Sequence, residues 1–331
     1  MAAFFGFKQI AHIYARYFHC AMKNNVFLCI CFIVLCACSN NKKQPPAETK
    51  HAVKANKPAK KTLAGNKPQY TNPLFNQYAV FIKSLNFTDP ENATKAAAKY
   101  AALFKGREAA TCDTAFLIFS NYYDKLSLEL DDTYQRATTM ADSELTGKRK
   151  PEKLRTNAGN YLSKLKNNGF DIAKDKGIAY VGQDRDFIAR WFYDDVSPVM
   201  KMYLEQLNKE NKNVYIKNAA ITISAKQLVE REIWWEQFVN EHPGFISIAD
   251  AVIHQKSYLQ ALLQGTDKTW IIDDNNDLND FFNEAYSYLL NKYPSSAAAK
   301  LVAPYYAFLK AGRRYRADSL MNVYQKDGVT G

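Results

Sequence analysis

The feature that most constrains this chain is a set of apolar residues that recur at steps of three and four. The set comprises Cys112, Phe116, Phe119, Tyr123, Leu126, Leu130, Ala137 and Met140, with one polar turn at Thr133. This spacing places the apolar side chains on one face of an α-helix of about 30 residues, roughly 45 Å long. Gly147 and Pro151 then break the pattern. A stripe this long must pack against other elements, so we expect a mainly α-helical fold.

One segment departs from the helical pattern. Phe170 and Ile172 alternate with smaller or polar residues, and Ile178 and Tyr180 do the same after the turn residues at 175–177. Alternation on both sides of a turn is typical of a hairpin, so the sequence predicts a small β-hairpin near 170–181. Further on, Ser224 and Gln227 have the spacing of a helix capping box.

The net charge of +11 lies mostly outside the part of the chain that is predicted to fold. Residues 38–72 contain eight lysines against the single acid Glu48, and four prolines. Such a segment cannot bury enough apolar surface to fold, so we predict a disordered Lys/Pro-rich tether. Residues 73–331, the predicted helical domain, contain 33 basic and 32 acidic side chains. We expect no binding to nucleic acid, because that would require a basic surface on the folded domain.

The N-terminal region has the pattern of a secretory signal. Residues 26–37 form an unbroken apolar run that follows Lys23, and twelve residues are too few for a membrane-spanning helix, which needs about 20. The run ends in Leu35-Cys36-Ala37-Cys38, which resembles the lipobox of bacterial lipoproteins. The resemblance implies a signal peptide over residues 1–37, cleavage before Cys38 and attachment of lipid to Cys38. A plain signal peptide and an uncleaved anchor are the alternatives.

The leader would be unusually long if it began at Met1, because signal peptides usually have about 15–30 residues. We therefore expect Met22 to be the true start, with an unusually long n-region as the alternative. Ser39 after the cysteine resembles outer-membrane sorting of lipoproteins, which implies a location in the outer membrane facing the periplasm. Cys112 is the one cysteine of residues 73–331, so no disulfide is expected within the domain.

Two segments near the C-terminus, about 50 residues apart, share one pattern. Trp235 corresponds to Tyr286, Phe238 to Leu289, and Pro243 to Pro294. Each copy is predicted to form a helix, a proline turn and a second helix. Phe308, Gly312, Ala317 and Met321 of the second copy resemble the packing positions of a tetratricopeptide repeat (TPR), although Leu301 and Pro304 depart from that consensus. The resemblance implies TPR-like hairpins over about 224–331, packed as an irregular α-solenoid, and a surface that binds protein. Two ordinary helical hairpins are the alternative.

Three tryptophans are candidate binding residues. Trp234 and Trp235 are adjacent, so on a helix they point about 100° apart and are both buried only if the helix is covered on two sides. Core packing is favoured for these two. Trp270 follows Gly265 in a predicted loop and is the first candidate for an exposed contact.

Motifs for catalysis or cofactor binding are lacking. The sequence has no GxG, HExxH or GxSxG pattern, and residues 273–284 resemble a calcium loop without its required glycine. We therefore expect no enzyme activity, no cofactor and no metal site. The favoured function is that of an envelope-anchored scaffold or protein-binding module. A glycan- or nutrient-binding lipoprotein is the alternative, and a cell-wall hydrolase that uses carboxylates such as Asp184 and Asp186 is the third hypothesis.

Overall fold

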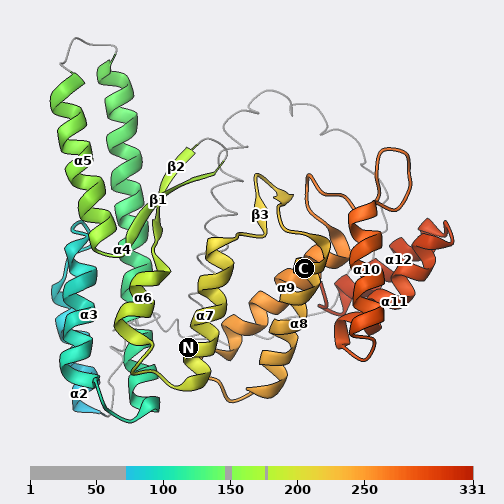
Figure 1. Ribbon diagram of the computed structural model, residues 1–331, viewed down its shortest axis with the longest axis horizontal. Helices are drawn as coiled ribbons and strands as arrows, with labels where there is room; N and C mark the ends of the chain where they lie inside the picture. Colours follow the sequence, from blue (N-terminus) through green and yellow to red (C-terminus); the bar gives the residue numbers. More distant parts are fainter. Residues whose placement is uncertain (1–71, 146–150, 176–177, 331) are drawn as a thin grey trace, which may run out of the picture. The chain divides into compact units, whose positions relative to one another are not determined.

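The computed structural model describes residues 72–145, 151–175 and 178–330 (Figure 1). The signal peptide and nearly all of the predicted tether lie outside these residues. The described part is mainly helical, as the sequence predicts. Its helices are α2 (Pro73–Ser84), α3 (Glu91–Phe104), α4 (Ala109–Leu145), α5 (Pro151–Asn167), α6 (Arg185–Phe192), α7 (Pro198–Lys212), α8 (Ala225–Glu241), α9 (Ile248–Gln264), α10 (Asp280–Lys292), α11 (Ala297–Lys310) and α12 (Arg314–Lys326). Two antiparallel pairs are formed by strands β1 (Phe170–Asp175) and β2 (Ile178–Gln183), and by β3 (Ile216–Lys217) and β4 (Ala220–Ile221).

The predicted long helix is α4, and the residues of its apolar stripe from Cys112 to Leu130 are buried in the surrounding core. The side chains of Ala137 and Met140, which complete the predicted stripe, lie outside the described part of the structure. Phe192 of α6 lies with its ring centroid 4.5 Å from Phe119 on α4 and 4.6 Å from Tyr100 on α3. All three rings are fully buried. Aromatic side chains remove much surface from water, so this contact fixes α3, α4 and α6 against one another.

The predicted β-hairpin forms between α5 and α6, with Phe170 paired to Gln183 and Asp175 paired to Ile178. It packs against α4, where Gln135 donates a hydrogen bond to the backbone oxygen of Ala179. Gly169 precedes the hairpin with φ of +92°, and a Cβ there would lie 2.6 Å from Cγ of Phe187. Glycine is required at this position because any larger residue would be strained and would clash.

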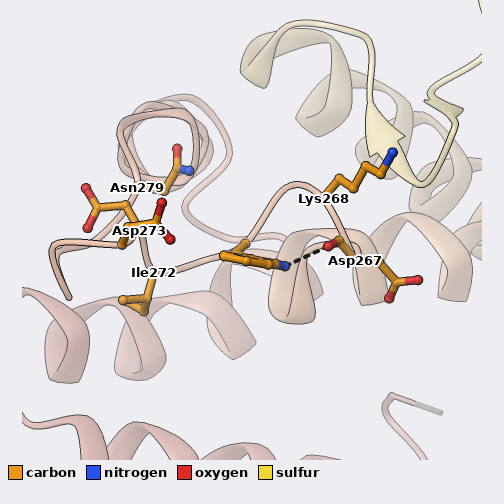
Figure 2. A pocket seen from close by; sticks show the side chains of 7 residues that line it. Asp267, Lys268, Ile272, Asp273 and Asn279 are labelled. Carbon is orange, nitrogen blue, oxygen red and sulfur yellow. Dashed lines mark hydrogen bonds between the residues drawn. The ribbon is translucent and has the colours of Figure 1, made fainter.

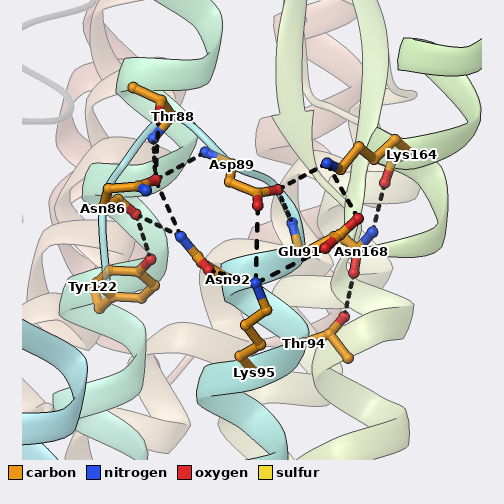
Figure 3. Close-up of polar contacts among 10 residues, drawn as sticks. All are labelled: Asn86, Thr88, Asp89, Glu91, Asn92, Thr94, Lys95, Tyr122, Lys164 and Asn168. Carbon is orange, nitrogen blue, oxygen red and sulfur yellow. Dashed lines mark hydrogen bonds and ion pairs between the residues drawn. The ribbon is translucent and has the colours of Figure 1, made fainter. Parts of the chain in front are cut away.

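A polar network joins α5 to the turn between α2 and α3 (Figure 3). The Lys164 ammonium on α5 lies 3.1 Å from a carboxylate oxygen of Asp89 and 3.1 Å from one of Glu91. Asn86, in the same turn, accepts the hydroxyl hydrogen of Tyr122 on its backbone oxygen at 2.9 Å. These bonds satisfy the turn's polar groups and hold it on α4 and α5, which is a structural role.

The C-terminal helices repeat one local geometry. Helices α8 and α10 are each followed by a C-cap residue of the same conformation. His242 has φ, ψ of −125°, 54°, and Tyr293 has −129°, 49°. A proline follows each of these residues, and the next helix folds back from there. Helix α8 packs against α9, α10 and α11, and α11 packs against α10 and α12 (Figure 1).

Within the residues that the structure describes, none of the helices has the length and apolar character needed to cross a bilayer.

Candidate functional site

Of the four residues that the sequence singles out, Cys38 lies outside the described residues. The structure places the three tryptophans in three different environments.

Trp235 belongs to the core and has no exposed surface. Its indole N–H donates to Oε1 of Glu210 at 2.8 Å, and the hydroxyl of Tyr258 donates to Oε2 at 2.9 Å. The side chain of Gln206 also donates to Oε1, at 2.6 Å. Glu210 is thus a buried acceptor that ties α7 to α8 and α9. Trp235 therefore packs in the core, as the sequence analysis favoured. It could contact a ligand directly only if these helices separated.

Trp234 is half-buried and stacks on Phe238, with ring centroids 5.2 Å apart and an interplanar angle of 15°. Its ring also meets that of Trp235 edge-on at 4.8 Å. Both ring partners belong to α8 itself, so Trp234 is covered in part by its own helix and keeps some of its surface exposed. The main contacts of Trp234 are with aromatic side chains of α8.

Trp270 is the exposed member of the group, with 56% of its surface accessible. It lies in the loop between α9 and α10, and its indole N–H donates to the backbone oxygen of Asp267 at 2.8 Å. The hydrogen bond fixes the direction of the ring without covering its faces. An indole held in this way presents a flat apolar surface to solvent.

The loop that carries Trp270 is held at several points. Thr266 and Thr269 form a short antiparallel bridge, and the backbone N–H of Lys268 donates to Ala219 in the turn between β3 and β4. Gly265 has φ of +69°, and a Cβ there would clash with the backbone oxygen of Thr269. The loop therefore depends on glycine at this position and on the neighbouring hairpin.

An open pocket of about 360 Å³ lies beside Trp270 (Figure 2). Its lining consists of Asp267, Lys268, Trp270, Ile272, Asp273, Asp274 and Asn279. The set combines one aromatic face with carboxylates, an amide and an ammonium group, so it can stack on a ligand and exchange hydrogen bonds with it. In the sequence, the acidic residues of this loop resemble only a calcium-binding loop. Their spacing does not predict that they share a pocket with Trp270.

A second open pocket, of about 480 Å³, lies where the starts of α4 and α7 meet the turn after α8. Asp113, Glu241, His242 and Ile246 are among its lining residues. Asp113 already accepts the backbone N–H of Ser197 at 2.8 Å. The pocket has no exposed aromatic face comparable to that of Trp270.

A cluster of titratable side chains lies between α4, α6, α7 and α9. The sequence analysis did not predict this cluster. Burial and, less strongly, the positive charge of Arg185 lower the pKa of His254 to about 4. Burial raises the pKa of Asp124, which accepts a hydrogen bond from Gln183 at 2.8 Å, and also raises that of Asp250. His254 stacks on Trp235 at 4.6 Å, so this polar cluster adjoins the Glu210 network.

Glu232 on α8 is a buried acid of a different kind. It has no exposed surface, and neither of its carboxyl oxygens has a hydrogen-bond partner among the described residues. Burial, and then the charge of Glu236 one turn away, raise the pKa of Glu232 to about 8. Glu236 itself accepts the backbone N–H groups of Ala297 and Ala298 at the start of α11.

The carboxylates considered for hydrolysis have local partners. Asp184 caps α6 by accepting the backbone N–H of Asp186 at 2.9 Å, and Asp186 accepts from Asn208 and Lys212. In the described ranges, no group of three or more His, Cys, Asp or Glu side chains is arranged to hold a metal ion.

Comparisons with protein-family models, with curated proteins and with solved structures found no match.

Proposed function

We propose that this chain is a lipoprotein of the cell envelope that acts as a scaffold or protein-binding module. Lipid on Cys38 attaches it to the membrane, and residues 38–72 connect the anchor to the helical domain. The support for the anchor is the sequence Leu35-Cys36-Ala37-Cys38 directly after a twelve-residue apolar run. The proposed location is the outer membrane, facing the periplasm.

The proposed binding region is the set of TPR-like hairpins from α8 to α12. Within this set α8 packs against α9, α10 and α11, and α11 packs against α10 and α12. Ala317 on α12, at a small-residue position of the resemblance, is fully buried. The proposal rests on the exposed side chains of α12, the last helix of this set. On α12, Tyr315 is 85% exposed and Val323 is 48% exposed. Terminal repeats of a solenoid usually have a polar outer face, so apolar side chains there favour contact with another protein.

Site-specific photo-cross-linking in cells tests this proposal. A cross-linking amino acid in place of Tyr315 is expected to give a discrete adduct in the envelope fraction, because the side chain faces the proposed partner. The matched control replaces Lys105, an exposed residue between α3 and α4. The adduct should be absent from the control and should disappear when Cys38 is changed to serine in the Tyr315 variant. The same products from both positions would contradict a binding surface on α12.

The exposed indole of Trp270 favours a second candidate function, the binding of a glycan or nutrient. A cell-wall hydrolase is less well supported, because Asp184 and Asp186 are engaged in capping and in bonds to neighbouring side chains.

A further inference from the structure

We propose that the pocket beside Trp270 is a saccharide-binding site in which one neutral pyranose ring stacks on the indole. This inference names the ligand class for the second candidate function, at a pocket whose lining contains no residue of α12. It stands whether or not α12 binds a protein and whether or not Cys38 carries lipid.

The indole forms a platform that is fixed before any ligand arrives. More than half of its surface is open to solvent, while its N–H is bound to Asp267 in the same loop. Thr269, one residue earlier, accepts the backbone N–H of Ile221 on its hydroxyl oxygen at 3.0 Å, which ties the loop to strand β4. A fixed ring loses little freedom when a ligand stacks on it, so more of the contact energy contributes to affinity.

Hydrogen-bonding groups line the pocket together with the platform. Figure 2 shows Asp273 and Asn279 close to each other and Lys268 apart from them. Local hydrogen bonds determine whether Asp273 and Asn279 accept or donate hydrogen bonds in the pocket. Oδ1 of Asp273 accepts the backbone N–H groups of Asn275 and Asp277, which leaves Oδ2 as an acceptor toward the pocket. Oδ1 of Asn279 accepts the backbone N–H of Phe281, which leaves its amide N–H groups as donors.

This combination matches a neutral sugar. A pyranose has an apolar face of C–H bonds and a rim of hydroxyl groups, each of which both donates and accepts hydrogen bonds. The indole and Ile272 provide the apolar contact, while Asp273 accepts and Asn279 and Lys268 donate at the rim. The cavity volume of about 360 Å³ falls near the lower end of the ~300–1,000 Å³ of small-ligand sites, which suits one or two sugar rings.

Other ligand classes fit the same groups less well. An organic cation would gain from the indole and the carboxylates, but the ammonium of Lys268 would repel it, and the pocket has one aromatic ring rather than a cage. An anion would meet three carboxylates, those of Asp267, Asp273 and Asp274. A ligand without net charge avoids both conflicts.

Saturation-transfer difference NMR tests the proposal on the full mature chain, purified in a detergent without a sugar headgroup. The probes are maltose, cellobiose and diacetylchitobiose at millimolar concentration, with choline as the cationic comparison. At least one disaccharide is expected to receive saturation, strongest at the protons of one ring face. Trp270→Ala should weaken its binding about tenfold, because the substitution removes the apolar face on which the sugar ring stacks. Trp270→Phe should retain part of the affinity, and Lys268→Met should weaken binding about threefold.

The control is Tyr315→Ala, which removes another exposed aromatic side chain outside this pocket. Its saccharide affinity should equal that of the unaltered chain. Circular dichroism and thermal melting should be unchanged in Trp270→Ala, because the indole lies mostly on the surface. The proposal is overturned if none of the disaccharides binds, if choline alone binds, or if Trp270→Ala and Tyr315→Ala bind the saccharide equally well. The cross-linking result at Tyr315 is independent of all these outcomes.

Discussion

Replacement of Glu232 by methionine is expected to raise the free energy of unfolding at pH 8 by about 2–4 kcal/mol. The reason is that Glu232 is completely buried and that neither of its carboxyl oxygens has a hydrogen-bond partner among the described residues. Ionisation of such a group is strongly opposed by burial, which raises its pKa from 4.5 to about 8. Methionine has a similar length and fills the same space without a polar group.

The same substitution is expected to flatten the pH dependence of stability. Between pH 4.5 and about 8, the folded chain keeps the proton on Glu232 while the unfolded chain releases it. The folded state therefore binds more protons in this range, so stability falls as the pH rises. Each pKa unit corresponds to about 1.36 kcal/mol, so the loss is on the order of 4 kcal/mol. Below this range both states are protonated and Glu232 contributes no slope.

Urea unfolding of both chains at several pH values within this range measures the effect. The difference between the variant and the unaltered chain isolates Glu232 together with its interaction with Glu236, because the more distant titrating groups contribute equally to both. Glu284→Met on α10 is the matched control, since Glu284 is exposed, and it should change stability by less than about half a kcal/mol. A destabilised Glu232→Met variant, or a difference between the chains that does not change with pH, would show that the buried carboxyl is stabilised by its surroundings.

Glu210 is expected to give the opposite result, although it is also a buried glutamate. Glu210→Leu should lower the free energy of unfolding by about 3–5 kcal/mol. The change removes the acceptor of three buried donors, which come from Gln206, Trp235 and Tyr258. Glu210→Gln keeps one acceptor oxygen and should cost less than Glu210→Leu. Burial raises the pKa of Glu210 despite these bonds, so the neutral amide is a tolerable substitute.

Glu205→Leu is the matched control for this prediction, because Glu205 is on the same helix and is exposed. Urea midpoints compared at equal slope should place the control within about half a kcal/mol of the unaltered chain. Equal losses for Glu205→Leu and Glu210→Leu would mean that the network around Glu210 does not hold α7 on α8 and α9.

Features that depend on local periodicity could be predicted from the sequence. Helix α4 follows from a stripe of apolar residues at helical spacing, and the hairpin of β1 and β2 follows from alternation on either side of a turn. Both patterns lie within a short stretch of sequence and are set by the geometry of a single element. The capping box of Ser224 and Gln227 was predicted for the same reason.

Features that depend on packing between distant segments could not be predicted. Glu210 and Glu232 both lie on helices with mixed surfaces, and sequence does not show that one meets three donors while the other meets none. The exposure of Trp270 could be anticipated from its loop. The approach of Asp273 and Asn279 to that loop could not, because it depends on the fold of the segment before α10.

The proposed function depends most directly on the anchor, and metabolic labelling with a fatty acid analogue tests it. The mature protein should incorporate the label and sediment with membranes. Cys38→Ser should remove the label and leave the chain unprocessed or in the soluble fraction, because the lipid-accepting thiol is lost. Cys36→Ser, two residues earlier in the same motif, should keep both properties, since serine is also small. Label on the Cys38→Ser chain would contradict attachment at this cysteine and, with it, the proposal of an envelope lipoprotein.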